Sequence, residues 1–209
     1  MAQHNAREVI CVFGQSGSGK TRWLQRFVKS QTRAIIIEGD FPDETDQFAG
    51  IRFDDYWEFH DYMKANYAGL FRARYSPRPE EFELMCTWAK EAGACALIID
   101  EADRFIRQGD IDPVFSELVF RGRHFGDGAG VSLVLAVSDP MKLPIDVRRL
   151  ATRMIIFNNT EPVDVKWLAE MFARDREWSE RVPLLQPGTF IEWRKAEGCA
   201  EKTLAQVSA

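Results

Sequence analysis

A glycine-rich segment near the amino terminus has the residue types and spacing of a phosphate-binding loop. Gly14-Gln-Ser-Gly-Ser-Gly-Lys20-Thr21 fits the pattern G-x-x-x-x-G-K-S/T and directly follows the apolar run 8–13. Its glycines let backbone N–H groups converge on one anion, and the helix expected after it adds a positive N-terminal end. The alternative, a flexible glycine- and serine-rich loop, is disfavoured by the apolar run before it and the amphipathic run after it.

This pattern assigns a role to each loop residue. Lys20 is expected to reach the β- and γ-phosphates of ATP, and the Thr21 hydroxyl is expected to hold Mg²⁺. The residues expected to surround the nucleotide are Gly14, Gln15, Ser16, Gly17, Ser18, Gly19, Lys20, Thr21 and Arg22.

Two consecutive acids, Asp100 and Glu101, follow the apolar run 96–99, as in a Walker B motif. Asp100 is expected to hold the Mg²⁺ shell through water, and Glu101 to orient and deprotonate the attacking water. An apolar strand that ends in Asp is common, but its combination with a phosphate-binding loop is specific. The glutamate favours hydrolysis over transfer of the phosphoryl group to the hydroxyl of a small substrate.

Two arginines and a serine are further catalytic candidates. Arg121 and Arg123 end an expected helix, where either can supply a guanidinium to the γ-phosphate in a neighbouring subunit. The alternative is that both are ordinary cations at a helix C-terminus. Ser138 ends the next expected strand, where a polar side chain can sense the γ-phosphate, although Asp139-Pro140 also suits a simple turn.

The composition limits the class of protein. A chain of 209 residues with 45% hydrophobic residues is long enough for one α/β domain with appendages. A net charge of −5 gives no overall basic field, which weighs against nucleic-acid binding, although a ring-shaped motor can contact a strand through a few residues. Apolar runs are shorter than the roughly 20 residues of a membrane span, and the N-terminus lacks a signal-peptide core, so we expect a cytosolic protein.

The cysteines and histidines predict no metal centre. The four cysteines lack metal-ligand spacing and are expected to be buried thiols, and the three histidines are scattered. These residues are Cys11, Cys86, Cys95, Cys199, His4, His60 and His124.

Short apolar runs alternate with longer helical patterns, which is typical of a mostly parallel sheet flanked by helices. The expected strands are 8–13, 34–38, 70–75, 94–99, 131–137 and 153–157, and the expected helices are 20–30, 54–66, 79–92, 113–124 and 162–172. Residues 1–175 are predicted to form the core and 176–209 an extension, with a small β-hairpin and a frayed or partner-dependent tail from about residue 197. The acidic segment 39–50 is predicted to be a surface loop, with a metal site as its alternative.

Together these segments resemble the FtsK/HerA superfamily of ring-forming, DNA-translocating ATPases. The resemblance covers about residues 8–195 and depends on the order of the motifs: the loop, Asp100-Glu101, Arg121-Gly-Arg123, a strand, Arg148-Arg149, a strand and Glu161-Pro162. It implies a RecA-like P-loop NTPase core with an additional strand and a catalytic glutamate. Arg123 matches the family's arginine finger best, whereas Ser138 stands where the family commonly has Gln.

Within that superfamily, the chain is most similar to the genome-packaging ATPases of membrane-containing icosahedral viruses with double jelly-roll capsids. From its short length we expect a minimal motor domain without an amino-terminal barrel domain, a transmembrane anchor or a separate DNA-reading module. The resemblance implies ATP and Mg²⁺ as cofactors, a homo-oligomeric ring, double-stranded viral DNA and a capsid or vertex-membrane protein as partners, and a location in the host cytoplasm or at the packaging vertex of the virion. The alternatives are an assembly factor of the zonula-occludens-toxin type and a small-substrate phosphotransferase.

Five arginines are candidates for DNA contacts, because basic side chains grip phosphates without reading sequence. They are Arg72, Arg74, Arg78, Arg148 and Arg149. For the segment 71–75, the alternation of aromatic and basic residues equally suits an edge strand with one polar face.

Overall fold

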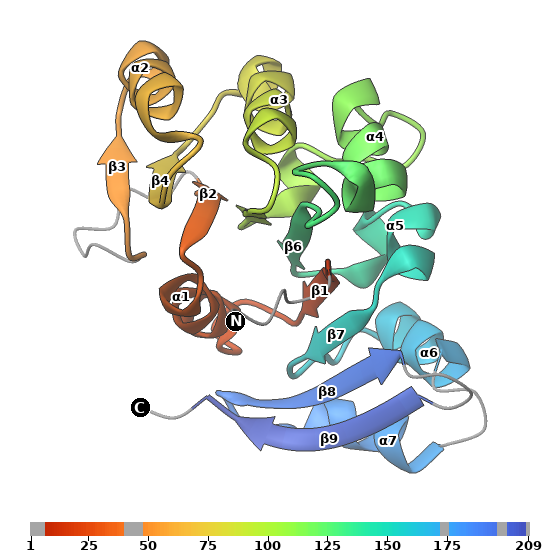
Figure 1. Ribbon diagram of the computed structural model, residues 1–209. Coiled ribbons are helices and arrows are strands. Elements are labelled where there is room, and N and C mark those ends of the chain that lie inside the picture. The colour runs from red at the N-terminus through yellow and green to blue at the C-terminus, as the bar shows by residue number, and fades with distance from the viewer. Residues whose placement is uncertain (1–6, 40–47, 172–175, 196–199, 208–209) are drawn as a thin grey trace.

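One mixed β-sheet of nine strands runs through the molecule, and helices cover both of its faces (Figure 1). The computed structural model describes residues 7–39, 48–171, 176–195 and 200–207. The strands are β1 Val9–Phe13, β2 Arg33–Ile37, β3 Ile51–Phe53, β4 Phe71–Tyr75, β5 Ala96–Ile99, β6 Ser132–Val137, β7 Arg153–Ile156, β8 Thr189–Lys195 and β9 Ala200–Gln206. The α-helices are α1 Lys20–Ser30, α2 Tyr56–Asn66, α3 Phe82–Ala92, α4 Pro113–Arg121, α5 Ile145–Leu150, α6 Pro162–Met171 and α7 Arg176–Arg181.

The strand order is β3-β4-β2-β5-β6-β1-β7-β8-β9. All pairs from β3 to β7 are parallel, and β8 and β9 are added antiparallel. Strand β6 therefore separates the strand before the phosphate loop from the strand that ends in Asp100. This inserted strand confirms the predicted RecA-like core with an additional strand, and the predicted C-terminal hairpin is present as β8 and β9.

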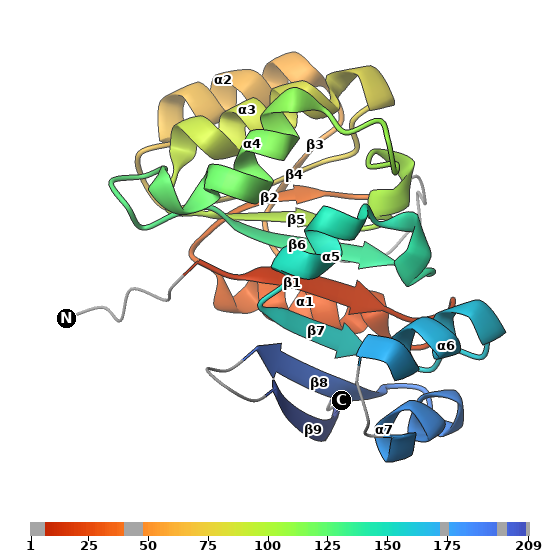
Figure 2. The same ribbon diagram turned by 90° about the vertical axis from the view of Figure 1, so that its right-hand side faces the viewer.

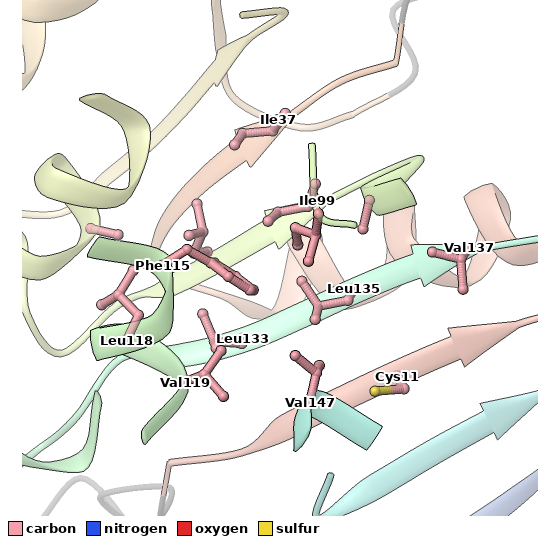
Figure 3. Packing of buried hydrophobic residues seen from close by; sticks show 14 of the residues in the cluster. Cys11, Ile37, Ile99, Phe115, Leu118, Val119, Leu133, Leu135, Val137 and Val147 are labelled. Atoms are coloured by element: carbon pink, nitrogen blue, oxygen red, sulfur yellow. The ribbon is translucent and has the colours of Figure 1, made fainter. Parts of the chain in front are cut away.

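Strand β1 shows why these strands are apolar on both faces. Ile10 and Val12 point into a cluster with Trp23 and Leu24 of α1. Cys11 faces the opposite cluster, to which α2, α3, α4, α5 and α6 contribute (Figure 3). A strand covered by helices on both sides has no polar face, as is usual for parallel sheets. Figure 2 shows α2, α3 and α4 stacked along one side of the sheet.

Helix starts follow local capping chemistry. The Asp55 side chain accepts hydrogen bonds from the backbone N–H groups of Trp57 and Glu58, so α2 begins two residues later than predicted. Asp112 likewise caps α4 by accepting from Phe115 N at 2.9 Å, and proline occupies the first helical position. The predicted helices 79–92 and 113–124 each contain one α-helix joined to a short 3₁₀ turn.

The structure corrects some of the predicted secondary structure. The predicted frayed tail is wrong, because Ala200–Gln206 forms β9 and pairs along the whole of β8. Strand β3 and helix α5 were not predicted, since three and six residues carry too little periodicity. Most of the acidic segment 39–50, and Cys199, lie outside the described residues.

Within the part of the chain that the structure describes, no helix has the length and apolar character needed to cross a membrane. The same part contains no cluster of three or more histidine, cysteine or acidic residues able to hold a metal ion. Cys11, Cys86 and Cys95 are buried free thiols, as predicted.

Candidate nucleotide-binding site

The phosphate loop needs glycine at positions where the chain turns tightly against its neighbours. Gly14 has φ +150°, and a Cβ there would lie 2.6 Å from Phe157 Cβ. Gly19 has φ +115°, and its Cβ would lie 3.1 Å from Gly188 Cα. Both positions combine left-handed backbone with close packing, which only glycine tolerates.

A cavity of about 810 Å³ opens beside this loop, at the edge where the parallel strands end. The loop residues that line it are Ser16, Gly17, Gly19, Lys20, Thr21 and Arg22. Asp100, Glu101 and Ser138 line the same cavity from the ends of β5 and β6. The carboxyl ends of neighbouring parallel strands meet at one edge, which explains why residues far apart in the sequence converge there.

Three predicted loop residues support the cavity instead of lining it. Gln15 donates from its backbone N–H to Asn158 O at 3.0 Å, and its side chain bonds Asn158 and Thr160. Ser18 is 4% exposed, and its carbonyl oxygen accepts from Gly188 N at 2.8 Å. With Gly14, they hold the loop against β7 and the C-terminal hairpin.

The Lys20 ammonium lies on the carbonyl oxygens of its own loop. Its Nζ donates to Gly14 O at 2.6 Å and to Gln15 O at 3.2 Å. Burial lowers the pKa of Lys20, while the carboxylates of Asp100 and Glu101 act in the opposite direction. Phosphate oxygens would be stronger, charged acceptors than these carbonyls, so the ammonium is placed to transfer to a bound triphosphate.

Thr21 and Asp100 present oxygen donors on the same cavity. Burial, followed by the neighbouring Glu101 carboxylate, raises the pKa of Asp100 to about 6. A buried carboxylate beside a like charge is stabilised by a cation, and Mg²⁺ in nucleotide sites takes one or two protein oxygens together with phosphate oxygens and water. The two residues therefore fit a Mg²⁺ ion delivered with ATP.

Glu101 occupies a special backbone position at the end of β5. It has φ +56°, a left-handed conformation that is uncommon for residues other than glycine, and its N–H donates to Asp100 Oδ1 at 3.1 Å. Its carboxylate lies over Gly39, where a Cβ would come within 2.7 Å of Glu101 Oε2. Such strained positions concentrate at functional sites, and this one directs the carboxylate into the cavity.

Ser138 is exposed at the end of β6 and borders the cavity. The next residue, Asp139, caps a short turn by accepting from Met141 N at 2.7 Å. The predicted turn at Asp139-Pro140 is thus present, and it leaves the Ser138 side chain facing the cavity.

The cavity contains a buried ion pair that sequence reasoning missed. Arg74 Nε donates to Glu38 Oε1 at 2.7 Å, and Arg74 Nη1 donates to Phe48 O at 2.6 Å. Arg74 is 2% exposed. Glu38 ends the predicted strand 34–38, and a charged residue at the end of a strand was an available signal for its role. Its pairing with Arg74 could not be predicted in this way, because it depends on β2 lying beside β4.

The burial of Arg74 contradicts its predicted DNA contact and also the predicted polar face of an edge strand, since β4 lies between β3 and β2. Arg148 is buried too, donating to Leu143 O at 3.0 Å with its guanidinium 5.0 Å from the centre of the Trp167 ring. Arg78 is exposed but is paired with Glu81 at 2.8 Å. Arg72 and Arg149 stay candidates on the surface.

Arg121 and Arg123 do not line the cavity of their own chain. Both are exposed at the end of α4, beside Gly122, whose carbonyl oxygen accepts from Val131 N directly before β6. They therefore lie at the edge where the parallel strands begin, opposite the phosphate loop (Figure 2). Any contact of these arginines with a γ-phosphate has to be made in another subunit.

The C-terminal extension also reaches the phosphate loop. Asn158 Nδ2, next to the loop, donates to Pro183 O at 2.9 Å and to Leu185 O at 3.0 Å. Val207 N donates to Gly188 O at 2.7 Å, which links the end of β9 to the turn that holds Ser18. Residues from the extension therefore form part of the support of the nucleotide site.

Comparisons with known proteins agree with this geometry. A family model described as an AAA domain matches residues 3–140. No curated protein sequence matched significantly.

Among solved structures, the genome-packaging NTPase B204 from Sulfolobus turreted icosahedral virus 2, in complex with sulfate, has a TM-score of 0.74 at 21% identity. The match covers 95% of this chain and 96% of B204. The bacterial conjugative coupling protein TrwB follows with a TM-score of 0.57 at 10% identity, over 96% and 85% of the two chains. The N-terminal domain of zonular occludens toxin from Neisseria meningitidis has a TM-score of 0.50 at 15% identity, over 98% and 96%.

At these identities the structural matches establish the fold, and it is the fold that the resemblance to the FtsK/HerA superfamily implies. The family model covers more than half of the chain and ends three residues after β6. The chain therefore belongs to the AAA domain family and has the fold of a RecA-like P-loop NTPase.

Proposed function

We propose that the protein is an ATP-hydrolysing motor that assembles as a ring and moves double-stranded viral DNA into a preformed capsid. One observation carries the proposal: a single cavity joins Lys20, Thr21, Asp100 and Glu101 in a chain whose fold matches a packaging NTPase over 95% of its length. The proposed location is the host cytoplasm or the packaging vertex of the virion, with a capsid or vertex-membrane protein as docking partner.

In the proposed mechanism, the loop N–H groups and Lys20 bind the β- and γ-phosphates. Thr21, together with Asp100 acting through water, would hold a Mg²⁺ ion, which would neutralise charge on the phosphate oxygens. Glu101 accepts a proton from water as the water oxygen bonds to the γ-phosphorus, and the bond to the β–γ bridging oxygen breaks. ADP and inorganic phosphate leave, and Glu101 returns its proton to solvent. Ser138 is placed to contact the γ-phosphate from the end of β6.

In the proposed ring, each nucleotide site receives an arginine from the adjacent subunit. Arg123, with Arg121 as the alternative, approaches the γ-phosphate in the adjacent subunit and stabilises the charge that develops there. This arrangement accounts for two exposed arginines at the edge of the sheet opposite the site of their own chain.

A displacement assay tests the motor directly. Linear duplex DNA carries streptavidin on a biotinylated end, and release of streptavidin is measured with ATP or with a non-hydrolysable analogue. The motor is expected to release streptavidin only with ATP, and a Lys20→Ala variant is expected to release none, whereas the exposed-surface control Lys64→Ala behaves as wild type.

The similarity to zonular occludens toxin favours a second candidate, a nucleotide-gated assembly factor. Such a protein would turn ATP over without releasing streptavidin and without a response to DNA. A phosphotransferase would consume ATP only when a hydroxyl acceptor is supplied.

A further inference from the structure

A second cavity, of about 740 Å³, lies between α1 and the C-terminal hairpin, both in the lower part of Figure 1. It reaches the edge of the sheet where β1, β6 and β7 begin, since Glu8, Ser132 and Thr152 line it. None of its lining residues belongs to the nucleotide cavity. It is therefore a separate site on the described part of the chain.

Basic side chains dominate the charge of this cavity. Its lining contains five cations, from four different parts of the chain, against one carboxylate, Glu8, whose oxygens lie 3.9 Å from Arg153 and 3.8 Å from Arg194. The cations are Arg7 before β1, Arg26 on α1, Arg153 on β7, and Arg194 and Lys195 at the end of β8. In a chain with a net charge of −5, this concentration of positive charge marks a site for an anion.

Three of the cations are held in place by neighbouring groups. Arg7 donates from Nε to Val131 O at 3.0 Å and from Nη2 to Leu118 O and Val119 O, both at 2.7 Å. Arg153 Nε lies 2.7 Å from Glu192 Oε1, and the Arg153 guanidinium lies 5.5 Å from the centre of the Trp23 ring. Arg194 Nε donates to the same Glu192 oxygen at 2.6 Å. Rigid donors lose little conformational freedom when a ligand binds.

Two others are available to a ligand. Arg26 and Lys195 are exposed, and neither forms an ion pair with a described residue. They lie on α1 and β8, on the two sides of the cavity, so one ligand can contact both. The pair gives the cavity a positive rim.

The arrangement suits a chain of phosphates better than one phosphate or a protein segment. Exposed cations on two separate elements, Arg26 on α1 and Lys195 on β8, suit a ligand with repeated charges, whereas a single phosphate needs donors that converge on one point. Trp23, Phe190 and Val207 in the wall are only 7%, 6% and 4% exposed, so they offer little apolar surface for the core of a protein interface.

We propose that this basic cavity, between α1 and the β8–β9 hairpin, binds the phosphate backbone of DNA. The proposal deepens the proposed function, on which it rests, by naming the surface that holds the translocated substrate. The buried Arg74 and Arg148 cannot fill that role, and the cavity offers exposed cations instead. The cavity is lined in part by α1, the helix that follows the phosphate loop, so DNA bound in the cavity can affect the nucleotide site through this helix.

The test compares two double variants that each remove two positive charges. R26A/K195A removes the two exposed cations of the cavity, and K29A/K64A removes two exposed lysines outside it. Lys29 lies on the same helix as Arg26, which matches the local context. Affinity for a fluorescein-labelled 30-base-pair duplex is measured by anisotropy at several salt concentrations, and thermal unfolding checks each fold.

The proposal expects R26A/K195A to bind the duplex at least about tenfold more weakly than K29A/K64A. The slope of log affinity against log salt concentration should also be shallower, by the amount that corresponds to about two lost phosphate contacts. Equal affinity of the two double variants would overturn the site but leave the motor intact. If the wild type neither binds DNA nor responds to it in ATP turnover, the proposed function fails, and this site with it.

A third result would assign the cavity to another ligand. If R26A/K195A keeps its DNA affinity but no longer self-associates in sedimentation velocity, the cavity binds an acidic surface of a neighbouring subunit, and the DNA proposal is overturned. If the double variant unfolds, the single variant Arg26→Gln is tested instead. Its salt-dependence slope should be shallower by the amount that corresponds to about one lost phosphate contact.

Discussion

Gly188 donates its backbone N–H to the carbonyl oxygen of Ser18 across 2.8 Å, which fastens the turn before β8 to the phosphate loop. The contact joins residues far apart in the chain and makes the C-terminal hairpin part of the support of the nucleotide site. Gly188 has φ +81°, a conformation that favours glycine.

Gly188→Ala is expected to lower stability by about 1 kcal/mol and to weaken nucleotide binding several-fold, because strain in the turn disturbs its bond to Ser18. Gly109→Ala is the matched control. Gly109 has φ +85°, and at both glycines a Cβ would meet nothing within 4 Å. Titration with a fluorescent ATP analogue, alongside thermal unfolding, should show equal destabilisation but weaker binding for G188A alone. Weaker binding in both variants would mean that the turn has no specific role.

Arg74→Met is expected to destabilise the protein by about 3 kcal/mol, because it leaves Glu38 without its partner inside the fold. The double variant Glu38→Gln/Arg74→Met should recover part of this loss. Denaturant unfolding of the two single variants and the double variant gives the coupling between the residues. Additive effects would show that the ion pair contributes nothing beyond its separate side chains.

Asp164 should make stability depend on pH. It is 3% exposed, and Asn159 Nδ2 donates to its Oδ2 at 2.7 Å. Burial raises the pKa of Asp164 to about 6, and the nearby Asp139 carboxylate adds to the rise. The native state thus binds more protons than the unfolded state between about pH 4 and pH 6, so this group's contribution to stability falls as pH rises through that window.

The Asp164→Asn side chain carries no charge at any pH, so the variant should not lose stability through this group as pH rises. Its stability relative to wild type is expected to increase by about 2 kcal/mol between pH 4 and pH 7.5, measured by urea unfolding at each pH. The substitution Glu91→Gln, at an exposed position on α3, serves as the control for replacing a carboxylate by an amide. A difference between D164N and wild type that stays constant with pH would contradict the raised pKa.

The arginines at the end of α4 are predicted to act on a neighbouring subunit. Arg123→Ala should lower ATP turnover by about 10³-fold, and Arg121→Ala should have the smaller effect. Mixing R123A with K20A should restore part of the activity, since a K20A subunit supplies its arginine to the intact loop of an R123A subunit. Lys64→Ala, at an exposed cation on α2 that lies outside both cavities, is the control. Full turnover in both R121A and R123A, or no recovery on mixing, would exclude a trans-acting arginine there.

Much of the site was predictable because its signals are local. The loop 14–21 and the pair Asp100-Glu101 each follow an apolar strand, and strand ends meet at one edge of a parallel sheet. The pair Glu38–Arg74 was not predictable, because it depends on which strands are neighbours and on the register that places Arg74 beside Ile36.

Elements stabilised mainly by long-range contacts escaped prediction as well. Strand β9 contains Glu201 and Lys202, whose charges resemble those of a solvated tail, yet it pairs along all of β8. Arg148 has the sequence context of a surface cation, but the fold places it against Trp167. Tertiary contacts decide these cases, and local propensity carries little information about them.

The central claim is that Glu101 drives ATP hydrolysis that is coupled to DNA. It is tested most directly by ATP turnover measured with and without long duplex DNA across a protein dilution series, for wild type and Glu101→Gln. We expect turnover per subunit to rise with protein concentration and with DNA for wild type, and to fall by at least about 100-fold in E101Q while nucleotide binding is retained. Full turnover in E101Q, or wild-type turnover that ignores both DNA and dilution, would contradict the account.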